Sequence, residues 1–147
     1  MKDFFLKISD RLSAEVPKLR LIDLEKGQTN DPDATQGLAF PAALIDIAFP
    51  SCDDTSGRDQ QCRVNVTVRV VDKTITDETS HLTPTPWRER SLAILDTVQS
   101  VVNALQGFDC GFSSPLSRTS QQPESGGDTL KVYRIVFTST FDEEFDE

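Results

Sequence analysis

Few side chains in this sequence could carry out chemistry. The chain has a single histidine, His81, among its 147 residues. A catalytic serine would need His81 as its general base, but the Gly-x-Ser-x-Gly turn that exposes such a serine is missing. One histidine and three scattered cysteines also lack the close spacing of a zinc-ligand set. We therefore expect no catalytic residue and no bound metal.

Aspartates in two polar stretches are the remaining candidate metal ligands. Asp31 and Asp33 belong to the first stretch, and Asp53 and Asp54 to the second. Neither stretch has the Asp-x-Asp-x-Asp-Gly spacing, with a closing glutamate, that is typical of a calcium loop. The adjacent glycines at 126–127 indicate a hairpin tip, because they lack the lysine and serine or threonine of a phosphate-binding loop. These residues predict solvated loops and no cofactor.

The charge and composition of the chain exclude some classes of partner. Acidic residues outnumber basic ones by 24 to 15, and the net charge of −9 argues against a protein that neutralises nucleic-acid phosphates. Its simplest consequence is solubility. No apolar run approaches the roughly 18 residues of a membrane span, and the start lacks the pattern of a secretory signal. We expect a cytoplasmic protein that does not bind membranes.

The cysteines could be reduced or paired. Cys52 and Cys62 flank a polar loop and could meet across the neck of a hairpin. An odd number of cysteines without a signal peptide favours reduced thiols, so the disulfide is the less favoured alternative. Cys110 is interpreted as a small packing residue.

The strongest structural signal is an amphipathic helix over 85–107. Thr85 suits its N-cap, Pro86 its first helical position and Gly107 the residue after its end. Five apolar side chains recur at helical spacing and are expected to face a sheet: Leu92, Leu95, Val98, Val102 and Leu105. Trp87 either packs into the core or anchors an interface, and we favour the core.

A first helix is predicted over 3–16, where Pro17 ends it. Its apolar side is formed by Phe4, Phe5, Ile8, Leu12 and Val16. Strands follow the period-two alternation over 40–49, 63–71 and 129–141. Weaker patterns predict an edge strand over 19–24 and an interrupted strand over 108–120.

Polar and turn-forming residues predict three loops between these elements. Residues 25–37 are expected to form a mobile loop, 50–60 a long hairpin tip and 121–127 a flexible turn. The last strand is expected to be covered on both faces, since Val132 and Val136 alternate with aromatic and aliphatic residues. The fold class is therefore α+β, a mostly antiparallel sheet with two helices packed on one face.

One domain is expected over 1–141, and the acidic tail over 142–147 is expected to be disordered. The sheet face away from the helices, which we call the outer face, is the candidate functional surface. Alternation places on it Leu44, Asp46 and Ala48, and on the neighbouring strand Arg63 and Arg69. The mixture of apolar and charged groups leaves two alternatives, an ordinary solvated face and a subunit interface.

Several segments resemble the tail-terminator and tail-completion proteins of long-tailed phages and prophages. The resemblance rests on the order of elements and on four segments: Phe40-Pro41-Ala42-Ala43-Leu44-Ile45-Asp46-Ile47, Arg63-Val64-Asn65-Val66-Thr67-Val68-Arg69-Val70, the helix from Ala93 to Gly107, and Leu130-Lys131-Val132-Tyr133-Arg134-Ile135-Val136-Phe137. It covers most of the chain. The segment 72–84 and the acidic tail depart from the family.

The resemblance implies a structural protein and not an enzyme. Proteins of this family form rings, typically of six copies, that cap the tail tube and join it to the head connector. It implies self-association, tail-tube and connector partners, no cofactor, and a location in the host cytoplasm during assembly and then in the virion tail. The competing hypothesis is a small binding module with a groove between helix and sheet, and an enzyme ranks third.

Overall fold

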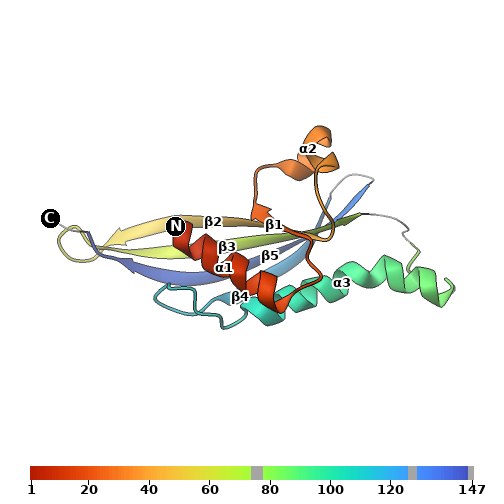
Figure 1. Ribbon diagram of the computed structural model, residues 1–147. Helices are drawn as coiled ribbons and strands as arrows, with labels where there is room; N and C mark the ends of the chain where they lie inside the picture. Colours follow the sequence, from red (N-terminus) through yellow and green to blue (C-terminus); the bar gives the residue numbers. More distant parts are fainter. Residues whose placement is uncertain (74–77, 126–128, 146–147) are drawn as a thin grey trace.

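The computed structural model describes residues 1–73, 78–125 and 129–145 (Figure 1). In chain order its elements are α1 (Lys2–Glu15), β1 (Leu21–Leu24), the 3-10 helix η1 (Gln28–Asn30), α2 (Pro32–Gln36), β2 (Ala42–Asp54), β3 (Gln60–Lys73), α3 (Thr85–Leu105), β4 (Ser117–Ser125) and β5 (Leu130–Glu143). Among the described residues, no helix is long and apolar enough to cross a membrane.

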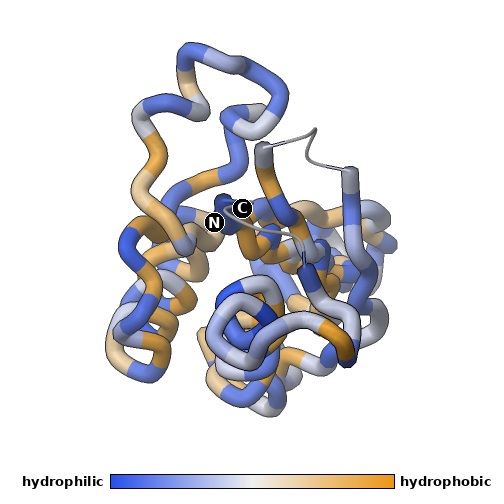
Figure 2. The backbone as a smooth tube through the Cα atoms, turned by 90° about the vertical axis from the view of Figure 1, so that its right-hand side faces the viewer, coloured by the Kyte–Doolittle hydropathy of each residue, from blue (hydrophilic) through white to orange (hydrophobic). Residues whose placement is uncertain are grey.

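The strands form one sheet in the order β1-β2-β3-β5-β4. Every neighbouring pair is antiparallel except β1 and β2, which run parallel. Parallel neighbours need a connection that returns along the sheet, and residues 25–41, with η1 and α2, make that return. In Figures 1 and 2 this connection lies above the sheet and α3 lies below it. The predicted α+β class is confirmed.

The main core lies between the sheet and the helices α1 and α3. Alternation along β3 works as expected, because Val64, Val66, Val68 and Val70 are all fully buried on the helix side. From β5, Ile135 and Phe137 join them. The predicted face of α1 is also confirmed: Ile8 and Leu12 are buried within it, Val16 is buried directly after its end, and Phe4 and Phe5 pack partly against the cluster.

The predicted apolar face of α3 is partly wrong. Leu95 is 43% exposed, whereas Ile94 and Val101 are buried. The apolar residues of α3 cover more than half of its circumference, so periodicity alone fits two overlapping stripes. Contact with the sheet selects the stripe through Ile94, Val98, Val101, Val102 and Leu105.

Two expected loops contain regular structure. Residues 25–37 hold η1 and α2, and side-chain bonds fix them: Gln28 Nε2 donates to the Leu24 carbonyl at 2.9 Å, and Thr35 Oγ1 to the Gln28 carbonyl at 2.6 Å. Local bonds from polar side chains to the backbone replace the missing apolar anchors. The hairpin tip is shorter than predicted, because β2 continues to Asp54 and β3 starts at Gln60.

The C-terminal third also differs from expectation. The fourth strand starts only at Ser117, and it includes residues 121–125, which were expected to form a turn. Pro123 is tolerated there because β4 is an edge strand with one side unpaired. Residues 126 and 127 of that expected turn lie outside the described part. The final strand extends to Glu143, and the Phe145 N–H donates to Asp59 Oδ1 at 3.0 Å, so the acidic tail is ordered to that point.

The cysteines also depart from the favoured alternative. Cys52 and Cys62 are opposite each other in the β2–β3 ladder and are joined as a disulfide. Backbone register therefore decided a pairing that spacing left open. Cys110 is free and buried, as expected of a packing residue.

A matched pair of substitutions on α3 tests which stripe faces the sheet. Val98→Ala removes a side chain that is 1% exposed and should lower the free energy of unfolding by about 1–3 kcal/mol. Leu95→Ala removes a larger but exposed side chain and should change it by less than about 0.5 kcal/mol. Urea unfolding followed by circular dichroism measures both. A larger loss for Leu95→Ala would contradict the observed face.

Candidate functional site

The residues with potential for catalysis do not come together. His81 is exposed in the segment before α3. Within the described ranges, no group of three or more His, Cys, Asp or Glu side chains could hold a metal ion. Burial raises the pKa of the Cys110 thiol, which keeps it protonated and poorly nucleophilic. The outer face of the sheet therefore remains the candidate functional surface.

Half of the outer face is covered by a second apolar cluster. Its buried members are Ala42, Leu44, Val71, Leu130 and Val132, and Leu21 and Phe40 pack against them. Leu44 is fully buried, so its expected exposure on this face is wrong. The cause is the β1–β2 connection, which folds back over the sheet and places Phe40 on the cluster. Lys73 Nζ lies 5.5 Å from the centre of the Phe40 ring.

Arg69 lies beside this cluster and is ion-paired with two glutamates of the same chain. Its Nε donates to Glu124 Oε2 at 3.0 Å and its Nη2 to Glu124 Oε1 at 3.4 Å, a forked contact with the edge strand β4. Its Nη1 lies 3.6 Å from Glu25 Oε2, just after β1. The bond to Glu124 is the main cause that raises the pKa of Arg69, and burial opposes it. Arg69 was expected to be displayed to a partner, but its charge is already satisfied.

The outer-face network links three strands, β3, β4 and β5, and Glu25 just after β1. Glu124 also lies 3.6 Å from Arg134 Nε on β5. Glu25 Oε2 is buried without a hydrogen bond, so the Arg69 guanidinium is the nearest group that balances its charge. The network and the apolar cluster together leave only the other half of the outer face for a partner. Asp46, Ala48 and Arg63 are exposed there.

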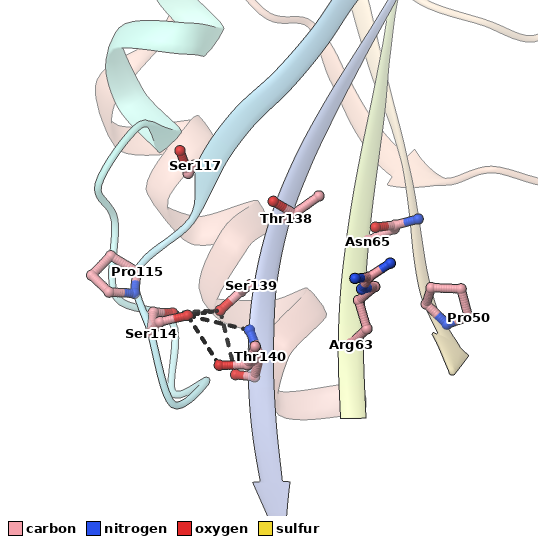
Figure 3. Close-up of a pocket in the computed structure, with 9 residues that line it drawn as sticks. All are labelled: Pro50, Arg63, Asn65, Ser114, Pro115, Ser117, Thr138, Ser139 and Thr140. Carbon is pink, nitrogen blue, oxygen red and sulfur yellow. Dashed lines mark hydrogen bonds between the residues drawn. The ribbon is translucent and has the colours of Figure 1, made fainter. Parts of the chain in front are cut away.

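A groove of about 660 Å³ lies on this free half (Figure 3). We call it the Arg63 groove. It lies between the bulged end of β2, β3, β5 and the loop before β4, and its lining is Pro50, Arg63, Asn65, Ser114, Pro115, Ser117, Thr138, Ser139 and Thr140. Arg63 and Asn65 point the same way from β3 because they are two residues apart on one strand.

Hydrogen bonds fix one wall of the Arg63 groove. The Thr140 N–H donates to Ser114 Oγ at 3.2 Å, and Ser139 Oγ donates to the Ser114 carbonyl at 2.6 Å. The Ser114 and Ser139 hydroxyls lie 2.9 Å apart. These bonds hold the loop before β4 against β5, so this wall of the groove is built before any partner arrives.

Most side chains that line the Arg63 groove can form hydrogen bonds. Arg63 makes no ion pair with any described residue, and the hydroxyl and amide groups around it offer further donors. A guanidinium with such neighbours suits a carboxylate or a peptide backbone. The residues that line the groove include no His, Cys, Asp, Glu or Lys.

The sequence placed three of its five interface candidates correctly on the exposed surface: Asp46, Ala48 and Arg63. It missed Glu25 and Glu124, the partners of Arg69. Glu124 is separated from Arg69 by 55 residues along the chain. No local pattern links two such positions, because only the β3-β5-β4 strand order brings them together.

The chain matches no protein-family model, and no curated protein matches it.

Substitutions of the two outer-face arginines compare Arg69, which is ion-paired, with Arg63, which makes no ion pair with a described residue. Arg69→Met leaves Glu25 without its ion pair and Glu124 with only the 3.6 Å contact to Arg134. It should lower the free energy of unfolding by about 1–2 kcal/mol, between the values for exposed and buried pairs. Arg63→Met should change it by less than about 0.5 kcal/mol. Chemical unfolding measures both. Equal effects would show that Arg69 is not structural.

Proposed function

We propose that this chain is a structural subunit of a phage or prophage tail, a ring-forming tail-terminator or tail-completion protein that caps the tail tube and joins it to the head connector. The observation that carries the proposal is the division of the sheet. One face and half of the other are covered within the chain, and the half around Arg63 is built but unoccupied by the chain's own residues. The α+β fold and the order of elements agree with the resemblance of the sequence.

Ring formation requires one patch of each copy to meet a different patch of the next. The free half of the outer face, with Asp46, Ala48 and Arg63, supplies the first patch. Arg63 makes no ion pair with a described residue, and hydrogen bonds fix one wall of the groove, so a partner would order few groups on binding. This half is the subunit interface in our proposal.

The charge of the chain suits a ring through which a genome passes. Arg69 and Arg134 are paired with glutamates, and the net charge is −9. A lumen with unpaired carboxylates repels the phosphates of a passing duplex, whereas a cationic lumen would hold them. The proposed subunit therefore has no specific nucleic-acid binding.

A stand-alone binding module is the alternative function. It would need an apolar pocket between the helices and the sheet. In the described part of the chain that space is filled by the main core, and the Arg63 groove lies on the surface, where seven polar residues and two prolines line it. These observations favour a protein partner over a small apolar ligand.

The assembly state of the purified chain tests the proposal. We expect closed rings in negative-stain electron microscopy, alone or after addition of tail-tube protein, and a matching mass in sedimentation velocity. Arg63→Glu should weaken assembly at low salt, and salt should reduce the difference as it screens exposed charges over ~8–10 Å. Lys18→Glu, an exposed charge reversal after α1, is the matched control.

Two outcomes would count against this account. Unchanged assembly of Arg63→Glu would move the interface away from the free half of the outer face. A wild type that stays monomeric even with tube protein present would remove the support for a tail terminator.

A further inference from the structure

The first turns of α3 project beyond the sheet (Figure 1). The helix has 21 residues, roughly 30 Å at 1.5 Å per residue. Toward its N-terminus, the hydrogen bonds to the sheet and the preceding segment occur at Ser91: Lys131 Nζ donates to the Ser91 carbonyl at 2.8 Å, and the Glu78 N–H to Ser91 Oγ at 3.1 Å. Residues 85–90, which we call the α3 overhang, precede that position.

Trp87 lies on the apolar stripe of α3 but is 48% exposed. Helical spacing aligns it with Ile94, Val98 and Leu105, which are buried. Trp87 precedes the position at which α3 meets the described part of the sheet, and it is exposed, so its interpretation as a core residue is wrong. The Arg90 guanidinium lies 5.3 Å from the centre of its ring. Leu82, just before the helix, is 81% exposed.

An exposed tryptophan braced by an arginine has the composition of an interface hot spot. Tryptophan and arginine are the residues most enriched among positions that dominate binding energy. A cation over the ring fixes the side chain before binding and reduces the entropy lost on docking. The α3 overhang therefore has the side chains of a segment that inserts into a partner protein.

The opposite end of the molecule carries the complementary charge (Figure 1). We define the hairpin end as residues 53–59 together with 142–145. It contains six acidic residues and one basic residue, Arg58. Asp53 and Asp142 are both level with Gln61 in the sheet register, two residues along β3 from Arg63. They lie on the outer face, at the end of the Arg63 groove.

We propose that the α3 overhang of one copy docks on the hairpin end of a second copy, with Trp87 in the Arg63 groove and Arg90 against Asp53 and Asp142. The inference rests on the proposed function, because it names the two patches that meet in the ring. The occupant is a second copy because the two patches are complementary in charge. The overhang exposes Arg90 and Glu89, and the other patch exposes Asp53, Asp142 and Arg63.

The two patches differ and lie at opposite ends, so the contact is heterologous. Each copy can bind one neighbour through its overhang and another through its hairpin end. Such a contact repeats, and it closes into a ring when the rotation between neighbours fits. Trp87 fills the groove in this contact, and the carboxylates set its orientation.

A mixing experiment with the full chain tests the contact. Trp87→Ala disables the overhang, and the double variant Asp53→Arg/Asp142→Arg disables the hairpin end. Each should associate about tenfold or more weakly than the wild type in sedimentation velocity. Mixed one to one, they should form a dimer and nothing larger, because only one intact pair of patches remains. Dimer formation also demonstrates that both variants are folded.

Leu6→Ala, on α1 with 44% exposure, is the matched control for loss of an exposed apolar side chain and should assemble like the wild type. Rings from Trp87→Ala equal to those of the wild type would overturn this inference and leave the proposed function standing. Variants that do not recover a dimer on mixing would overturn it too. Open filaments that need Trp87 would support the contact and contradict the closed ring. A wild type that stays monomeric even with tube protein present would overturn both.

Discussion

The strict alternation of β3 is the constraint on which the rest of the structure depends. Its valines point to one face and its polar residues to the other, and both neighbours, β2 and β5, pair with it along most of its length. A strand with one apolar face must bury that face. The helices α1 and α3 do so from one side and form the main core. The polar side of β3 is then left as a row of Arg69, Thr67, Asn65 and Arg63, and the protein treats the two ends of this row differently.

At the Arg69 end, the chain completes its own surface. The β1–β2 connection folds over Leu44 and places Phe40 on the cluster. Glu25, just after β1, and Glu124, in β4, both contact the Arg69 guanidinium. At the Arg63 end, no carboxylate of the described residues forms an ion pair with the guanidinium, and the groove beside the hydrogen-bonded hydroxyl wall is open. Two arginines on one strand thus differ. Arg69 is ion-paired within the chain, and Arg63 belongs to the surface that we propose as the interface.

The molecule is elongated, and its ends are chemically unlike. The α3 overhang exposes an aromatic side chain with a cation on it, whereas the hairpin end is acidic. A tail ring needs repeating contacts that do not attract the genome passing through it, and paired arginines with a net negative charge meet that need. These features support the proposed subunit. The interacting side chains also lie on a helix and on strands, so binding costs little conformational entropy.

The sequence alone determined the class of the fold, because period-two and period-3.6 patterns report which side of each element is apolar. It identified α1 and its face, β2, β3, β5 and the start of α3, and it placed Asp46, Ala48 and Arg63 on the outer face. It could not determine which of two overlapping stripes of α3 meets the sheet, nor that Trp87 lies past the sheet's end, because both depend on the position of another element. The burial of Leu44, the Cys52–Cys62 pairing and the Arg69 network were decided only by strand order and register. Local patterns report the face of each residue, but its partners belong to distant parts of the chain that only the tertiary fold brings within contact distance.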